Sequence, residues 1–141
     1  MSKFERCPCA SKTLYHKCCK PFHDGKPPEN ALLLMRSRFA AYALGLADYI
    51  IETTHSDHPE FSKDRARWKE SIEAFSRATS FDHLTIKEFV DGEQTATVSF
   101  TAHLRQAGSD ATFSENSSFV KENDRWLYKS GVIEGETSGA K

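Results

Sequence analysis

Four cysteines carry the clearest chemical signal in the sequence. They form two close pairs separated by eight residues, a Cys-Pro-Cys and a Cys-Cys, at Cys7, Cys9, Cys18 and Cys19. Zinc is bound by four thiolates in a tetrahedron at about 2.3 Å, and two close pairs joined by a short loop can supply them. His16 and His23 lie nearby and could replace one cysteine as a ligand. The spacing therefore predicts a zinc site.

Disulfide or redox chemistry is the alternative use of these cysteines. A bridge within either pair is strained relative to ordinary disulfide geometry, although two bridges between the pairs are sterically possible. The N-terminus lacks an apolar signal region, so we expect a cytoplasmic protein, and such bridges do not persist in that compartment. We favour zinc in a structural role, because four thiolates close its shell and leave no open position for chemistry.

The cysteine segment differs in charge from the rest of the chain. Residues 1–26 contain six Lys or Arg against two acidic residues, whereas the remaining residues contain 13 basic and 18 acidic groups. The 141 residues are 38% hydrophobic and 11% aromatic, with a net charge of -1. This composition indicates one packed domain with a small appendage, and it excludes a strongly basic nucleic-acid-binding protein. No stretch approaches the ~18 apolar residues of a membrane helix. We expect a cysteine module at 1–26 and a domain at 27–141.

The cysteine segment resembles the SEC-C motif, a short zinc-binding tail of the preprotein-translocase ATPase that also occurs in many small bacterial proteins. The resemblance is carried by Cys7-Pro8-Cys9-Ala10-Ser11, Tyr15, Lys17 and Cys18-Cys19. Where the family has glycines, this chain has Ala10 and Lys12. The resemblance implies zinc binding and contact with a macromolecular partner. The candidate contact residues are three lysines around one aromatic ring, Lys12, Tyr15, Lys17 and Lys20.

Hydrophobic spacing predicts helices in the first half of the domain. A proline-stiffened linker at 21–28 precedes a helix that should begin near Glu29-Asn30. Apolar residues from Ala31 to Ile51 recur every three or four positions, with Gly45 as a weak point or a break. A second helix is expected from residue 62 or 63 to about Arg77, after a turn at 53–59.

Alternation predicts strands in the second half of the domain. Apolar and polar residues alternate over 94–104, and further strands are expected at 84–90, 111–121 and 125–128, while 134–141 should fray. Turns are expected at Asp91-Gly92 and at 122–124. Helices followed by a meander of strands predict an α+β fold, in which a curved antiparallel sheet surrounds the helices.

Further segments resemble the YchJ-like family of uncharacterised bacterial proteins. They are the run from Leu34 to Phe39 with Ala41-Tyr42 and Tyr49-Ile50, and the closing strands from Phe113 to Gly131. Together with the cysteine module, the match covers nearly the whole chain. The core of that family resembles the nuclear transport factor two-like α+β roll, which implies a pocket at the open end of a cone. The resemblance implies no particular reaction.

A partly buried ion pair is expected between Arg36 or Arg38 and Glu115. Arg36 lies at the edge of the helical apolar stripe, and Glu115 shares a strand face with apolar residues. A charge on a core-facing side must be paired. We favour a structural bridge over the floor of a pocket whose wall would include Tyr42, His55, His103 or Trp126. On the favoured interpretation, His55, His58 and His103 are surface residues.

No Ser/His/Asp set, phosphate-binding glycine loop or paired carboxylates stand out, so we expect a protein that is not an enzyme. The favoured hypothesis is a zinc-stapled adaptor that docks a protein or ribonucleoprotein partner through the cysteine module. The alternative is small-molecule binding or an unrecognised enzymatic activity in the pocket of the roll. A local contact with the ribosome or RNA through the lysines is a third hypothesis, but the net charge argues against binding free nucleic acid. A homodimer is possible.

Overall fold

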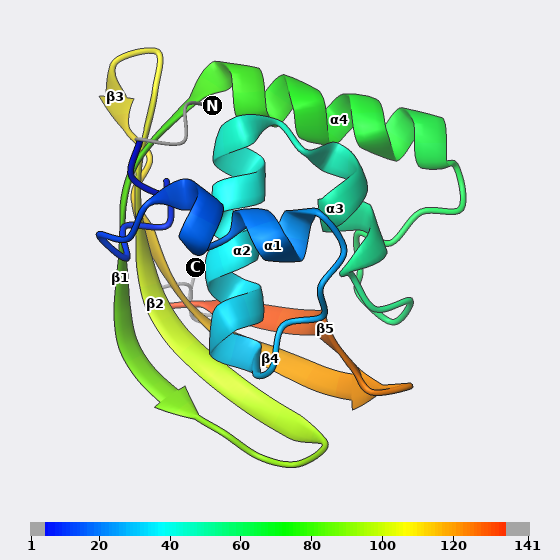
Figure 1. Ribbon diagram of the computed structural model, residues 1–141. Coiled ribbons are helices and arrows are strands. Elements are labelled where there is room, and N and C mark those ends of the chain that lie inside the picture. Colours follow the sequence, from blue (N-terminus) through cyan, green and yellow to red (C-terminus); the bar gives the residue numbers. More distant parts are fainter. Residues whose placement is uncertain (1–4, 135–141) are drawn as a thin grey trace.

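The computed structural model describes residues 5–134, and its α+β architecture confirms the predicted fold class (Figure 1). Helical segments come first and strands follow. In chain order the elements are η1 (Tyr15–Lys17), α1 (Lys20–His23), α2 (Ala31–Leu44), α3 (Ala47–Glu52), α4 (Arg65–Ala78), β1 (Thr79–Val90), β2 (Thr95–Gln106), β3 (Ser109–Asp110), β4 (Phe113–Glu122) and β5 (Arg125–Ile133). Across residues 5–134, no helix is long and apolar enough to cross a membrane. The fraying expected at 134–141 falls, from residue 135 on, outside the described residues.

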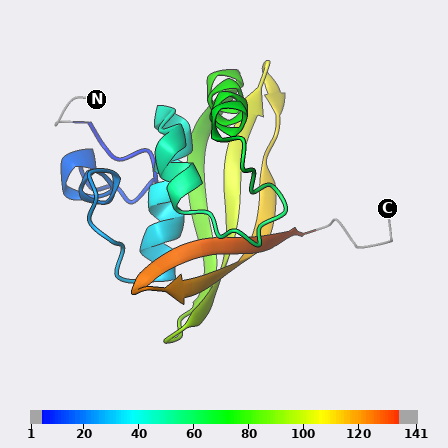
Figure 2. The same ribbon diagram turned by 90° about the vertical axis from the view of Figure 1, so that its right-hand side faces the viewer.

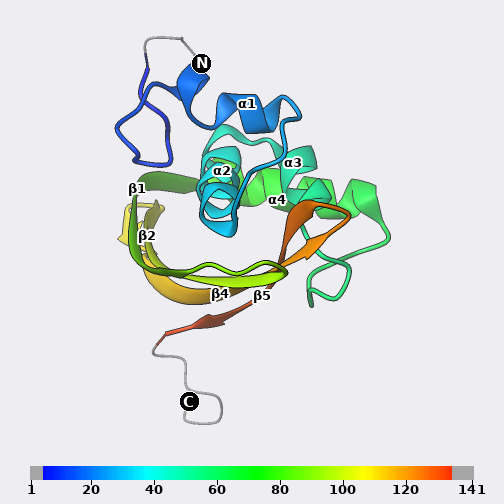
Figure 3. The same cartoon turned by 60° about the horizontal axis from the view of Figure 1, so that its bottom comes forward.

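The strands form one antiparallel sheet in the order β1-β2-β4-β5, and the short β3 pairs with β2. Two irregularities in β1, after Phe81 and after Ile86, shift its register against β2. Bulges bend and twist a strand, and the sheet curls around the helices as predicted (Figure 3). The inner face of β2 carries the predicted alternate residues, all of them buried: Ala96, Val98, Phe100, Ala102 and Leu104.

Helix α2 is the central element, because it lies between the sheet and the N-terminal cysteine module (Figure 2). The Asn30 side chain caps its start by accepting a hydrogen bond from the Leu33 N–H at 2.8 Å. Its buried residues occupy more than one face. One face packs on the sheet core, and Ala40 on another face packs on the cysteines. A helix covered on both sides does not show a single apolar stripe.

The helix predicted over 31–51 is divided into two helices at Gly45, the weak point noted in its sequence. Gly45 ends α2 in the left-handed conformation with φ at 74°, and α3 begins at Ala47. The change of direction lets α3 and α4 bury a second apolar cluster that includes Trp68 and Ile72. Asp64 caps α4 by accepting a hydrogen bond from the residue 67 N–H at 3.1 Å, close to the predicted start.

The linker predicted from residue 21 begins later than expected. Pro21 lies in the first turn of α1, which begins at Lys20, so this proline belongs to a short helix and not to the linker. A proline in that position loses no intrahelical hydrogen bond, and its fixed φ suits a helix. Irregular backbone begins at Asp24, the C-cap of α1.

The segment between α3 and α4 folds back onto the edge strand β5. Thr54 forms an isolated parallel bridge with Tyr128, and the His55 N–H donates to the Tyr128 carbonyl at 2.8 Å. His55 is 7% exposed, and its Nε2 lies 2.6 Å from Glu122 Oε2. The prediction of a surface position for His55 is therefore wrong, because the turn is anchored to the sheet rather than projecting into solvent.

Candidate metal centre and internal cavity

The four cysteine sulfur atoms converge in the N-terminal module. All four Sγ atoms lie within 4.8 Å of one another, with 3.6 Å between Cys9 and Cys18 and 3.9 Å between Cys18 and Cys19. Four thiolates around a zinc ion at about 2.3 Å would lie about 3.8 Å apart. The cysteines are free thiols, and these separations far exceed a disulfide bond of about 2.05 Å. The cluster therefore has the donors and the spacing to hold one metal ion.

A tight turn after the first pair brings the two pairs together. The Cys7 N–H donates to the Thr13 carbonyl at 2.8 Å, and the Ala10 N–H donates to the Cys7 carbonyl at 3.2 Å. Ala10 and Lys12 have φ angles of 67° and 71°. These values lie in the left-handed region, where a Cβ atom crowds the following carbonyl oxygen. The turn thus keeps the backbone geometry that glycine favours, although both residues carry a Cβ.

Arg36, predicted to face Glu115, contacts the cysteine cluster instead. Its Nη1 donates to the Cys9 carbonyl at 2.9 Å and lies 3.9 Å from Cys9 Sγ. Hydrogen bonding with Cys18 lowers the pKa of the Cys9 thiol, and hydrogen bonding with Cys19 lowers the pKa of Cys18 to about 7. The thiolate is the metal-binding form of cysteine. Hydrogen bonding with Cys18 also raises the pKa of Cys7 and Cys19, so a bound cation is needed to hold all four as thiolates. The Arg36 guanidinium would offset part of the remaining negative charge.

Both ring nitrogens of His23 form hydrogen bonds outside the cysteine cluster. Its Nδ1 lies 2.7 Å from the Tyr15 hydroxyl, and its Nε2 lies 2.8 Å from the Ser37 carbonyl oxygen. Burial lowers the pKa of His23. Among residues 5–134, the group placed to hold a metal contains the four cysteines and neither His23 nor His16. His23 therefore fastens the module to α2 rather than replacing a cysteine ligand.

The candidate partner-contact residues divide into exposed lysines and a buried tyrosine. Lys12 and Lys17 are exposed. Lys20 is exposed as well, but its Nζ forms an ion pair with Asp24 at 2.7 Å. Tyr15 is only 7% exposed, and burial raises its pKa to about 12. The expectation that Tyr15 offers a stacking ring is wrong, because its ring belongs to the module's own core.

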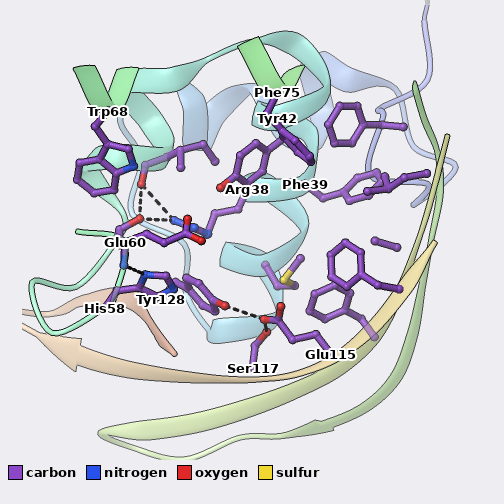
Figure 4. Close-up of a pocket in the computed structure, with 18 residues that line it drawn as sticks. Arg38, Phe39, Tyr42, His58, Glu60, Trp68, Phe75, Glu115, Ser117 and Tyr128 are labelled. Atoms are coloured by element: carbon purple, nitrogen blue, oxygen red, sulfur yellow. Dashed lines mark hydrogen bonds between the residues drawn. The ribbon is translucent and has the colours of Figure 1, made fainter. Parts of the chain in front are cut away.

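A second candidate site lies inside the roll, between the helices and the concave face of the sheet (Figure 4). The cavity has a volume of about 250 Å³. Many of its lining residues are aromatic, among them Phe39, Tyr42, Phe75, Phe81, Phe100 and Phe113. Its polar side includes Arg38, His58, Glu60, Glu115, Ser117 and Tyr128. An apolar cavity with a few convergent polar groups is the usual form of a small-molecule site.

Glu115 points into this cavity from β4 and is held by two hydroxyl groups (Figure 4). The Tyr128 hydroxyl donates to its Oε2 at 2.7 Å, and the Ser117 hydroxyl donates to the same oxygen. Burial and the adjacent Glu115 charge raise the pKa of Tyr128, so the phenol remains a donor. The predicted ion pair is wrong, since neither Arg36 nor Arg38 pairs with Glu115 among the described residues. The hydroxyl donors take the place of the arginine.

Arg38 lines the cavity and is 6% exposed. Its Nη1 donates to three oxygen atoms of α3 and the following turn: the Ile50 carbonyl at 3.2 Å, Thr53 Oγ1 at 2.8 Å and Thr54 Oγ1 at 3.1 Å. The guanidinium carbon lies 4.6 Å from the centroid of the Tyr128 ring, a cation–π distance. These contacts anchor one end of the guanidinium group.

Of the predicted wall residues, Tyr42 lines the cavity, whereas Trp126, His55 and His103 do not. Trp126 is 3% exposed in the main core, and its Nε1 has no hydrogen-bond partner in the described part of the chain. Sequence reasoning missed His58, Trp68 and Tyr128 as lining residues. His58 packs on the Tyr128 ring at 4.9 Å between centroids, and burial lowers its pKa. Only the fold of the turn at 53–64 brings His58 there, so no local pattern could have found it.

Comparisons with known proteins agree with this architecture. A family model described as "YchJ, middle NTF2-like domain" matches residues 30–131. A UPF0225 protein of Vibrio parahaemolyticus is 34% identical over 140 residues, which cover 94% of this chain and 77% of that protein. A UPF0225 protein of Bordetella pertussis is 37% identical over 131 residues, which cover 90% of this chain and 92% of that protein.

A solved structure extends the likeness to the cysteine module. The solution structure of a SEC-C motif containing protein from Rhodopseudomonas palustris matches with a TM-score of 0.76 and 32% sequence identity, and the match covers 89% of this chain and 96% of that chain. The central domain, the cysteine cluster and the order of elements therefore agree with one group of proteins. The chain belongs to the YchJ-like family, with an N-terminal SEC-C motif and an NTF2-like fold.

Proposed function

We propose that the chain binds one zinc ion through Cys7, Cys9, Cys18 and Cys19, and that the zinc-stabilised module docks a macromolecular partner. The convergence of four Sγ atoms within 4.8 Å is the observation that supports this proposal most strongly. Sulfur donors at this spacing suit the tetrahedral coordination that zinc prefers. Bound zinc would hold the two cysteine pairs together in a segment too short to have a large core of its own.

A structural role for the zinc follows from the closed donor set. A catalytic zinc keeps an open position for water or substrate, but four thiolates occupy all the positions of a tetrahedron. Three of the cysteines are also almost inaccessible, with exposures of 4% for Cys7, 0% for Cys9 and 1% for Cys19. Cys18 is half-buried and lines a surface groove together with Cys19, so the structural assignment rests on the closed set of four thiolate donors.

The module is supported by the domain beneath it. Ala40 of α2 packs against the cysteine cluster, Arg36 of α2 donates to the Cys9 carbonyl, and His23 lies 2.8 Å from the Ser37 carbonyl oxygen. These contacts leave the opposite side of the module turned away from α2 (Figure 2). Such an arrangement suits a docking element that needs a rigid base.

The exposed lysines support a partner with negatively charged groups. Lys12 and Lys17 are exposed on the module. A groove between the module and α2 is lined by Lys17, Lys26 and Arg36, with Glu29 as the acidic group in its wall. Basic side chains on a mildly acidic protein favour a local contact with an acidic protein surface or with ribosomal RNA over general binding to nucleic acid. Such a partner would be met in the cytoplasm.

The zinc part of the proposal is tested by metal analysis combined with NMR. The protein is purified without added zinc, its metal content is measured, and heteronuclear spectra are recorded before and after chelation. We expect one zinc per chain and loss of the signals of residues 5–26 on chelation. Metal-free protein with unchanged spectra would overturn the zinc assignment, and free or reversibly paired thiols would then point to redox chemistry.

The docking part is tested by cosedimentation of the zinc-loaded protein with purified ribosomes at low and high salt. A Lys17→Glu variant reverses one exposed charge of the module, and Lys63→Glu makes the same change at an exposed position before α4. We expect salt-dependent binding that Lys17→Glu weakens and Lys63→Glu leaves unchanged. Absence of cosedimentation would exclude the ribosome and restrict the proposal to a protein partner. Equal effects of both variants would contradict docking through the module.

A further inference from the structure

The roll contains a buried cation with unused hydrogen-bonding capacity. A guanidinium group has five N–H donors, yet among the described residues only Nη1 of Arg38 makes hydrogen bonds. No carboxylate of residues 5–134 lies within ion-pair distance of it. With an exposure of 6%, the group has little access to solvent other than through the cavity that it lines. An unpaired charge at such depth is costly and calls for an anionic partner.

The protein's own carboxylates do not meet this need. Glu115 lines the same cavity, but its Oε2 accepts hydrogen bonds from Tyr128 and Ser117. Glu60 lines the cavity from the turn before α4, and its side chain is exposed to solvent. Because two acidic groups share the site, a ligand with two or more negative charges would be repelled. A ligand with a single negative charge is the better match.

The aromatic residues that line the cavity indicate the shape of the apolar part of the ligand. Phe39, Tyr42 and Phe75 present their rings to the cavity (Figure 4). Phe81 and Phe100 also line it. An apolar cavity of about 150 Å³ admits benzene, and this cavity has about 250 Å³. One aromatic ring with a small charged substituent therefore fits the available space. The cavity is partly open to solvent rather than fully enclosed, so a ligand has a way in.

We propose that the cavity of the roll binds a small aromatic carboxylate, whose carboxylate pairs with Arg38 and whose ring lies among the aromatic side chains. A carboxylate is planar and carries one charge, so it can accept two parallel hydrogen bonds from the free side of the guanidinium group. The site is separate from the cysteine cluster, and it goes beyond the proposed function without depending on zinc.

The proposal is tested by NMR titration of the full-length, zinc-loaded protein with benzoate and phenylacetate. Benzamide serves as the uncharged control of nearly the same shape. We expect saturable shifts in the Arg38 side-chain N–H signal with the carboxylates, and affinity for benzamide about 10- to 100-fold lower, because a charge-assisted pair is lost. Equal affinity for benzoate and benzamide, or no saturable shift with either carboxylate, would overturn the proposal.

Two variants locate the binding. Arg38→Met removes the cation, and Arg67→Met makes the same change at an arginine of α4 whose side chain is 86% exposed. Ala102→Leu fills the cavity from β2 and leaves Arg38 in place. We expect Arg38→Met and Ala102→Leu to abolish benzoate binding and Arg67→Met to preserve it. If Arg38→Met fails to fold, Ala102→Leu decides, since benzoate binding that survives a filled cavity contradicts the proposal.

Discussion

Lys12 lies in the turn between the two cysteine pairs in a left-handed conformation, with φ at 71°. This conformation costs a residue with a Cβ about 1–2 kcal/mol. Glycine avoids that cost, but its greater freedom in the unfolded chain opposes folding by about 0.5–1 kcal/mol. Lys12→Gly should therefore increase the free energy of unfolding by about 0.5–1 kcal/mol. The lysine side chain is exposed, so its removal loses little packing.

The assay is urea denaturation of the zinc-loaded protein, followed by far-UV circular dichroism. A stabilised variant should show a higher midpoint at an unchanged slope. Lys12→Ala is the matched control, because it removes the same side chain but keeps the Cβ and should leave the midpoint nearly unchanged. Ala10 also has a positive φ of 67°, but it packs against the core. Ala10→Gly should therefore give a net change near zero. Equal midpoints for Lys12→Gly and Lys12→Ala would refute the strain argument.

Two further predictions concern buried hydroxyl groups. Burial raises the pKa of all four tyrosines above the ordinary 10.0. The protonated phenols therefore stabilise the fold fully below pH 10, and this stabilisation is lost as the pH rises through the raised pKa values. In an alkaline pH titration, the phenolate absorbance should therefore rise only as the protein unfolds. Tyrosine ionisation near pH 10 in protein that keeps its native circular dichroism spectrum would contradict this prediction. Ser37, with 0% exposure, bonds the Leu34 carbonyl at 2.8 Å and the Tyr49 hydroxyl at 2.7 Å. Ser37→Ala leaves that phenol unpaired and should lower the free energy of unfolding by about 1–3 kcal/mol, whereas Ser99→Ala on the exposed sheet face should change the urea midpoint little.

The architecture could be predicted because local patterns and the overall fold agree. The alternation in β2 matches its buried and half-buried faces, and Gly45 marks the end of α2. The turn at 122–124 has positive φ values at Asn123 and Asp124, 51° and 61°, which suit a two-residue hairpin. In each case a short segment determines its own conformation, so the sequence alone is informative.

The arginine partners could not be predicted, because α2 is buried on more than one face. The apolar stripe placed Arg36 toward the sheet, yet Arg36 contacts the cysteine module and Arg38 lines the cavity. The helical spacing does place Arg38 on the cavity face of α2, because Arg38 lies three residues after Met35 and four before Tyr42, and Met35 and Tyr42 both line the cavity. This spacing became recognisable only when the fold showed which face of α2 meets the sheet. Tyr15 was misassigned because it is buried among the cysteines and Ala40 of α2, which the local sequence does not show.

Zinc K-edge X-ray absorption spectroscopy of the purified protein tests the central claim most directly. The spectrum reports the identity, number and distance of the atoms bound to zinc. A closed shell formed by Cys7, Cys9, Cys18 and Cys19 predicts four sulfur atoms at about 2.3 Å and no oxygen neighbour. A bound water, or fewer than three sulfur ligands, would contradict a structural zinc site at this cluster.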